Sequence, residues 1–217
     1  MTQLAEEQDI ALDYDRFMGR WSALIAEQFV DWLAIPAGRR WLDVGCGTGA
    51  LTAAIVRRTA PLEVWGIDPE EAYVSRAGKR FGGGNRHFTV ADAQALPPQL
   101  QGLDVAVSGL VLNLLPEPAT GLLEQVRVTR PGGVVAAYVW DFAAGMRLLR
   151  HLWDAAGTFD PEADALDQGK RYPLCRPEPL RALFQSVGLS AIDVQALHIA
   201  TPFRGFTDYW ESLANGH

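Results

Sequence analysis

The chain has 217 residues, of which 48% are hydrophobic and 21% are charged, as in an ordinary globular domain. Its formal net charge is −7 and no long run of Lys or Arg is present, which excludes the electrostatic pattern of a nucleic-acid-binding protein. No segment approaches the ~18 apolar residues of a membrane helix, and the acidic N-terminus does not resemble a secretory signal. We therefore expect one soluble, cytoplasmic domain.

Only two cysteines, Cys46 and Cys175, are present, and they lie far apart in the sequence. This is not a disulfide framework, and no Cys/His cluster has the spacing of a zinc site. We expect neither a structural disulfide nor a metal.

Strand and helix patterns alternate along most of the chain. An apolar stripe at helical spacing predicts a helix over 21–33, ended by Pro36 and Gly38. The following predicted elements are, in order, a strand at 41–45, a helix near 51–55, a strand at 62–68, a helix at 70–80 closed by glycines 82–84, strands at 87–92 and 103–108, a helix near 122–126, and a strand at 134–140 launched by the PGG at 131–133. This order predicts an open, doubly wound, mostly parallel α/β sheet with helices on both faces.

The pattern is less regular after Asp141. Helices are expected at 145–156 and around 180–187, a sixth strand over 191–199, and a helical turn with a tail over 206–217.

The most informative segment is the loop after the first strand, where Gly45, Gly47 and Gly49 alternate behind Asp43. Glycine permits positive φ and close approach of a ligand to the backbone, and ligands of open α/β sheets lie outside the carboxyl ends of the strands. The same loop fits the dinucleotide pattern G-x-G-x-x-G/A, with Ala50 in the last place. Asp43 opposes that interpretation because a carboxylate would repel a pyrophosphate, whereas it suits the sulfonium and ammonium groups of S-adenosylmethionine.

Two further acids follow predicted strands. Asp68 ends the second strand, where it could accept hydrogen bonds from both ribose hydroxyls or cap the helix that begins after Pro69. Asp92, after the third strand, could accept from an adenine amino group or act as a simple cap.

Together these residues resemble the class I S-adenosylmethionine-dependent methyltransferases, over about 14–199. Five blocks occur in the family's order: LDVGCGTG, GIDPEEAYVSRA, ADAQALP, LDVAVSGLVLNLLP and RVTRPGGVVAAYVW. Within this family the chain resembles the small-molecule branch and is similar to the ubiquinone and menaquinone biosynthesis methyltransferases. The resemblance implies one domain with an N-terminal helical lid (1–36), a cofactor-binding core (37–141) and substrate-side helices with a last strand (142–217).

The resemblance also implies roles for single residues. Gly45, Gly47 and Gly49 would hold the methionine part of the cofactor, with Cys46 as a small filler and Asp43 near the ammonium group. The remaining implied contacts are Asp68 and Pro69 for ribose, Asp92 and Ala93 for adenine, and Ser108, Gly109 and Leu110 for the sulfonium region. Tyr14, Arg16, Arg20 and Trp21 are candidates for the lid; Arg20 could pair with the cofactor carboxylate or be a solvated surface arginine.

Family members usually end with a seventh, antiparallel strand, and the residues after Trp210 do not read as one. A sheet that lacks this strand has an uncovered edge, which favours pairing with another chain. We therefore include a homodimer among the expectations.

Methyl transfer to oxygen or carbon needs a general base. Asp141, at the end of the fifth predicted strand, and His151, on the next helix, are the candidates, and His198 is a third titratable group nearby; structural roles for the histidines stay open. Aromatic residues follow the fifth strand: Trp140, Phe142, Trp153, Phe159 and Tyr172. They suggest an apolar or aromatic small substrate, or else a plain core.

The sequence thus predicts transfer of a methyl group from S-adenosylmethionine to a small molecule, with S-adenosylhomocysteine as the product. Two alternatives remain, an NAD-dependent oxidoreductase and a non-catalytic protein that binds S-adenosylmethionine. The methyl acceptor and the atom methylated are not determined by the sequence.

Overall fold

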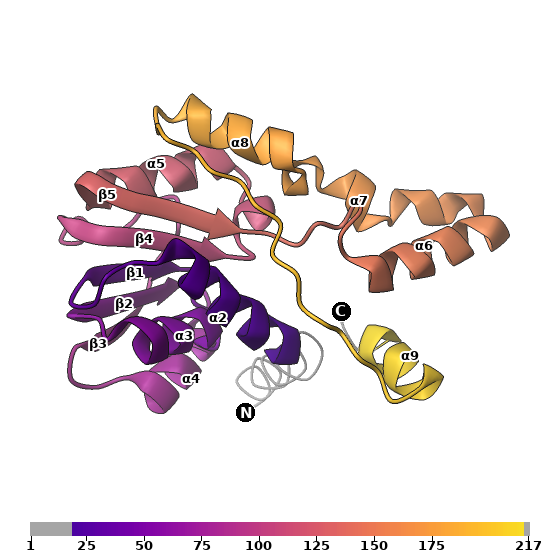
Figure 1. The fold of residues 1–217 in the computed structure, drawn as a ribbon, viewed down its shortest axis with the longest axis horizontal. Helices are drawn as coiled ribbons and strands as arrows, with labels where there is room; N and C mark the ends of the chain where they lie inside the picture. Colours follow the sequence, from indigo (N-terminus) through magenta and orange to yellow (C-terminus); the bar gives the residue numbers. More distant parts are fainter. Residues whose placement is uncertain (1–18, 215–217) are drawn as a thin grey trace.

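The computed structural model describes residues 19–214. Its centre is a five-stranded sheet in the order β3-β2-β1-β4-β5, and all neighbouring strands are parallel (Figure 1). The strands are β1 (Arg40–Val44), β2 (Glu63–Asp68), β3 (Arg86–Val90), β4 (Leu103–Gly109) and β5 (Thr129–Tyr138). The α-helices of the described part are α2 (Arg20–Leu33), α3 (Ala50–Thr59), α4 (Glu71–Phe81), α5 (Pro118–Val128), α6 (Arg147–Phe159), α7 (Gln168–Arg171), α8 (Pro177–Ser186) and α9 (Phe206–Ala214), with short 3-10 turns η2 (Leu112–Leu114), η3 (Pro161–Ala165) and η4 (Pro173–Cys175).

The strand order places a ligand crevice at the carboxyl ends of β1 and β4. From β1 the chain builds outward to β2 and β3, then returns to β4 on the other side of β1. The two crossovers leave β1 and β4 in opposite directions, and this reversal opens a crevice between their ends.

Helices cover both faces of the sheet (Figure 1). Helices α2 and α3 pack on one face around Phe29, Trp41 and Ile55, which are almost fully buried. On the other face, α5 and α8 pack through Leu122 and Phe184. The strands are apolar on both faces, as expected of a parallel sheet covered by helices. The predicted fold class is confirmed, and the five strands predicted before Asp141 are all present in the sheet.

The fifth strand begins earlier than predicted. The PGG sequence lies inside β5, because Leu103 pairs with Thr129 and Val105 pairs with Val134, with an irregular register between them. The extra residues on β5 bulge out of the ladder, which is where glycine and proline are tolerated in a strand.

The prediction of a sixth strand over 191–199 is wrong. Ala191 has a left-handed backbone with φ 54°, and the carbonyl oxygen of Ile192 accepts a hydrogen bond from the Arg181 guanidinium at 2.7 Å. The segment runs without regular structure from α8 to α9 (Figure 1). Ile192 packs with the α5 and α8 cluster, whereas Leu197 packs with the α2 and α3 cluster. Alternating burial therefore reflects an irregular segment that crosses the free side of β5 rather than a hydrogen-bonded strand.

The helices α6, α7 and α9 lie beyond the carboxyl ends of the strands (Figure 1). Trp21 of α2 joins them in a cluster with Met146 and Leu149, and its ring meets that of Phe203 edge-on with centroids 5.8 Å apart. None of the helices in the part of the chain described by the structure is long and apolar enough to cross a membrane.

Candidate functional site

The glycine loop between β1 and α3 depends on its glycines in the conformation seen. Gly45 has φ 70°, and a Cβ there would lie 2.3 Å from Cγ2 of Val111. Gly49 has φ 94°, and a Cβ there would lie 2.7 Å from the Phe81 ring. Positive φ and close packing together exclude side chains at both positions. The loop is therefore held tightly between the chain that follows β4 and the end of α4.

Several N–H groups of this loop already have protein acceptors. The Cys46 N–H donates to the carbonyl oxygen of Ile67 at 2.8 Å, and the Gly47 N–H donates to a carboxylate oxygen of Asp68 at 3.0 Å. The Gly49 N–H donates to the carbonyl oxygen of Cys46 at 2.9 Å. A phosphate-binding loop offers such groups to its ligand, and here these three are engaged within the protein.

Asp43 lies beneath the loop and is fully buried. The Thr52 hydroxyl donates to Oδ2 at 2.6 Å, and Oδ1 has no hydrogen-bond partner within residues 19–214. Burial raises the pKa of Asp43 to about 7, against the hydrogen bonds from Thr52 and with a smaller contribution from the nearby Asp68. An unpaired buried carboxylate oxygen is a strong acceptor for a cationic group.

Asp68 ends β2 and holds the loop from the other side. Its two carboxylate oxygens accept from the Gly47 and Glu70 N–H groups, each at 3.0 Å, and the residue is 8% exposed. Burial raises its pKa, while these two bonds act in the opposite direction. Asp68 therefore fixes the loop and begins the turn into α4, and it also lines a cavity.

That cavity, of about 490 Å³, lies at the carboxyl ends of β1 to β4. The sequence-predicted residues that line it are Gly45, Asp68, Pro69, Asp92 and Ala93. Asp92 also accepts from the Gln94 N–H at 2.8 Å, so its capping role is present as well. Sequence reasoning missed Glu70, Tyr73, Gln94, Val111, Leu114, Leu115 and Pro116 as lining residues. Their positions directly after β2, β3 and β4 were the available signal, since ligand-facing residues follow strand ends in this fold.

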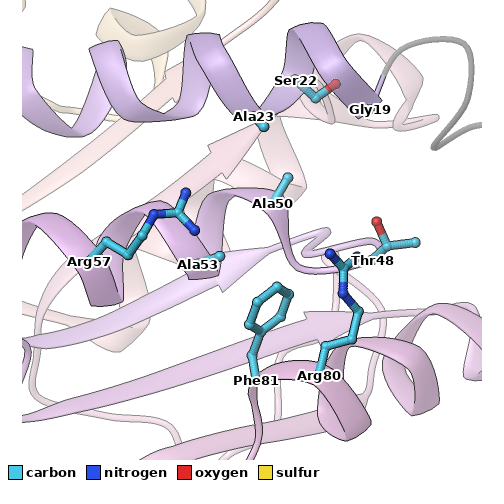
Figure 2. Close-up of a pocket in the computed structure, with 9 residues that line it drawn as sticks. All are labelled: Gly19, Ser22, Ala23, Thr48, Ala50, Ala53, Arg57, Arg80 and Phe81. Atoms are coloured by element: carbon cyan, nitrogen blue, oxygen red, sulfur yellow. The ribbon is translucent and has the colours of Figure 1, made fainter.

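A second cavity, of about 290 Å³, lies between α2, α3 and α4. Figure 2 shows the Arg57 and Arg80 guanidinium groups on either side of the Phe81 ring, with Thr48 of the glycine loop beside Arg80. Arg57 pairs with Glu27 at 2.8 Å. The two cavities thus flank the glycine loop with opposite charge among their described residues: carboxylates on one side, guanidinium groups on the other.

The end of β4 carries Ser108, Gly109 and Leu110, all predicted to face the sulfonium region. Ser108 is fully buried, and its hydroxyl has no partner within the described residues. A Cβ on Gly109 would lie 2.5 Å from the Tyr138 hydroxyl oxygen, so that space is filled by the tyrosine. Leu110 has φ 64°, which is rare for leucine and marks a constrained turn at this crevice.

The structure describes only some of the residues predicted for the lid. Tyr14 and Arg16 lie outside the described residues, and of Arg20 the structure describes the backbone alone, at the start of α2. Trp21 is 5% exposed and packs into the cluster that joins α2 to α6 and α9.

The two catalytic candidates have different surroundings. Both carboxylate oxygens of Asp141 accept backbone N–H groups, from Ala144 at 3.0 Å and Gly145 at 2.8 Å, which stabilises the turn before α6. His151 is exposed on α6. Cys46 is buried and its thiol pKa is raised, first by burial and then by Asp43 and Asp68, so it is not an activated nucleophile. Within the described residues no group of three His, Cys, Asp or Glu side chains could hold a metal ion.

Comparison with known proteins agrees with this architecture. A family model described as a methyltransferase domain matches residues 42–133. This segment is similar to methyltransferase domains. It contains the glycine loop, Asp68, Asp92 and the end of β4, which are the features that form the crevice.

An uncharacterised methyltransferase of Mycobacterium ulcerans is 36% identical to the chain over 135 residues, which cover 59% of this chain and 52% of the relative. The chain thus spans about half the length of the curated relatives it matches.

Two solved structures share the fold outside the domain match as well. A Methanococcus maripaludis protein assigned as an S-adenosyl-L-methionine-dependent methyltransferase aligns with a TM-score of 0.62 at 17% identity, covering 87% of this chain and 85% of that one. An S-adenosylmethionine-dependent methyltransferase of Thermotoga maritima aligns with a TM-score of 0.61 at 21% identity, covering 83% and 78%. At such identities the likeness establishes the fold.

Proposed function

We propose that the chain transfers a methyl group from S-adenosylmethionine to a small-molecule acceptor. One observation carries this proposal: two buried carboxylates, Asp43 and Asp68, adjoin a glycine loop whose N–H groups at Cys46, Gly47 and Gly49 are already bonded. A pyrophosphate would meet negative charge and find few donors, whereas a cationic, phosphate-free nucleoside suits both features.

The residues present fit S-adenosylmethionine. Oδ1 of Asp43, buried and without a described partner, would accept from the ammonium group. Asp68 and Asp92 would accept from ribose hydroxyls and the adenine amino group in the larger cavity, beside the apolar wall of Val111 and Leu115. When bound, the cofactor supplies a methyl group made electrophilic by a sulfonium.

The chain's own contribution is alignment and removal of water, because displacement at an activated methyl carbon needs no covalent intermediate. The crevice between β1 and β4 would align the two reactants. Asp141 and His151 are the candidates for the general base that an oxygen or carbon nucleophile requires. The test is the pH dependence of the methyl-transfer rate in the wild type and in the variants Asp141→Asn and His151→Gln. If the wild-type rate falls as the pH is lowered and only one variant loses this dependence, the residue changed in that variant is the base.

An apolar or aromatic acceptor is the proposed substrate class. Trp140, Phe142 and Trp153 belong to one cluster beyond the carboxyl ends of the strands, and the Tyr172 ring lies 5.6 Å from that of Phe142. Phe159 is 89% exposed and lies outside this cluster. The four clustered rings already contact protein atoms, so the acceptor would meet their free edges.

Calorimetry separates the proposal from the NAD alternative. We expect S-adenosylmethionine and S-adenosylhomocysteine to bind, and Asp43→Asn to weaken both, while NAD does not bind. Tight NAD binding without S-adenosylmethionine binding would reject methyl transfer. Labelled methyl transfer to a panel of aromatic acceptors then distinguishes an enzyme from a protein that only binds the cofactor.

Two further expectations concern the whole protein. Within the described residues β5 pairs only with β4, and the segment 191–199 that crosses its other side adds no strand; we propose a homodimer. Light scattering at micromolar concentration tests it, and a monomeric mass would contradict it. A cytoplasmic location also stays a prediction.

A further inference from the structure

The second cavity, between α2, α3 and α4, takes no part in the proposed methyl transfer. The charged side chains that line it in the described part of the chain are both cationic: Arg57 of α3 and Arg80 of α4. Figure 2 shows their guanidinium groups on either side of the Phe81 ring. The small residues of the lining are Gly19, Ala23, Ala50 and Ala53. Small residues next to two cations leave a volume of about 290 Å³, near the lower end for small-molecule sites.

Arg57 has hydrogen-bond donors that the described protein does not use. Its Nη2 donates to Glu27 at 2.8 Å, and this is the hydrogen bond that the Arg57 side chain makes within residues 19–214. A guanidinium carries five N–H donors, so Nε and Nη1 can still bind a second acceptor. The ion pair with Glu27 is exposed, with 51% of the Arg57 side chain open to solvent, and such pairs contribute little to stability. A ligand can therefore share Arg57 without disturbing the fold.

Arg80 is placed at the cavity by an aromatic contact. Its guanidinium carbon lies 4.9 Å from the centroid of the Phe81 ring, a cation–π distance. The ring itself is held against the glycine loop, since a Cβ on Gly49 would lie 2.7 Å from it. Figure 2 shows the Arg80 guanidinium beside Thr48 of the same loop. The cavity thus combines a fixed positive charge with an apolar ring.

The charge of this cavity does not suit S-adenosylmethionine. The larger cavity is lined by the carboxylates of Asp68, Glu70 and Asp92 and by no described Lys or Arg, and the two cavities share no lining residue. Guanidinium groups would repel a sulfonium and an ammonium group. The ligand of the second cavity is therefore a different molecule with the opposite charge.

We propose that the second cavity binds a small organic anion. Its carboxylate or phosphate group lies between Arg57 and Arg80, and its apolar part lies against Phe81 and Ala53. The planar fork of a guanidinium matches both kinds of head group through paired, charge-assisted hydrogen bonds. This site is separate from the crevice of the proposed function and does not depend on it.

The test is calorimetry with two probes, phenyl phosphate and benzoate, which share a ring and differ in the head group. We expect millimolar binding to the wild type, and the tighter of the two probes identifies the head group. Arg57→Gln should weaken binding by about tenfold, as for a lost hydrogen bond to a charged group. Arg57→Lys, which keeps the charge, should lose less.

Arg58→Gln is the matched control, because Arg58 is the next residue of α3, pairs with Asp31 at 2.6 Å and does not line the cavity. It should change either Kd by less than about twofold, since distant exposed charges are screened by salt. A saturating amount of S-adenosylhomocysteine should also leave the anion Kd unchanged.

Three results would overturn the anion site and leave the proposed function intact. They are the absence of binding by both probes at millimolar concentration, equal losses in Arg57→Gln and Arg58→Gln, and competition between the anion and S-adenosylhomocysteine. Failure of the wild type to bind S-adenosylmethionine, with anion binding retained, would contradict the proposed function alone.

Discussion

The sheet region, from Arg40 to Tyr138, and the region after β5 are held together in different ways. In the sheet region, neighbouring strands are joined by backbone ladders, and Leu42, Ile67 and Leu103 are fully buried between layers. After β5, the helices are joined through side chains that are mostly half-buried, such as Leu152, Trp153 and Ile199. Because backbone hydrogen bonds repeat along every strand, the structure of the sheet region depends little on any single side chain. The arrangement of the helices after β5 depends instead on a few side-chain contacts.

In the region after β5, specific polar contacts connect the helices to one another. The Arg150 guanidinium bonds both carboxylate oxygens of Asp167, which ties α6 to the start of α7. The Trp153 indole donates to Gln168 at 2.5 Å, and the Tyr209 hydroxyl donates to Leu148. Contacts of this kind depend on side chains distant in sequence, so a periodic pattern does not reveal them.

The largest expected difference between the two regions is in the unfolding free energy that is lost when an apolar side chain is truncated to alanine. Ile67→Ala removes a fully buried side chain from the centre of the sheet, and we expect a loss of about 3–4 kcal/mol in unfolding free energy. Ile199→Ala removes a half-buried one, for which about 1 kcal/mol is expected. Urea denaturation measures both. Similar losses at the two positions would show that the regions are equally well packed.

The second expected effect is a pH dependence specific to the sheet region. The pKa of Asp43 is about 7 in the folded chain against 3.8 in its ordinary state. The folded state therefore binds the proton more tightly, so this contribution to stability is complete below about pH 4 and is lost as the pH rises toward 7. Between pH 5 and pH 8 we expect wild type to lose roughly 2–3 kcal/mol of unfolding free energy relative to Asp43→Asn.

Paired denaturation curves at the two pH values measure this difference, with the asparagine variant cancelling all other titrations. S-adenosylmethionine should reverse the effect, because a cation next to Oδ1 favours the carboxylate and releases the proton. A difference independent of pH would mean that Asp43 is ionised throughout the range.

The sequence-based predictions were more accurate for the sheet region than for the region after β5. Glycines 45, 47 and 49, with Asp43 and Asp68, were recognisable because local backbone geometry and charge determine the loop. Gly109 was identified, but Tyr138 above it was not, since their contact arises only when β4 and β5 pair. The strand predicted over 191–199 failed because Ala191 adopts positive φ and Arg181 occupies the Ile192 carbonyl, neither of which changes the alternating pattern.

The third prediction concerns cofactor affinity. Asp68→Ala removes the proposed ribose acceptor and frees the Gly47 and Glu70 N–H groups. We expect S-adenosylhomocysteine binding to weaken by about 2 kcal/mol, measured by calorimetry. Asp193→Ala, an exposed carboxylate in the region after β5, is the control and should leave affinity unchanged. An unchanged Kd for Asp68→Ala would remove Asp68 from the ribose role and leave it only the loop contacts.

The smallest expected effect has a sign that distinguishes the two descriptions of residues 191–199. Ala191 has φ 54°, where glycine is favoured, so Ala191→Gly should raise the unfolding free energy by about 0.5 kcal/mol. In a paired strand the same change would lower it by about that amount, because glycine is costly there. Ala196→Gly, at a position without positive φ, should lower stability and serves as the internal reference. A loss of stability at both positions would favour a paired strand over 191–199, whereas a gain at 191 alone would confirm the left-handed backbone of Ala191, which a paired strand does not allow.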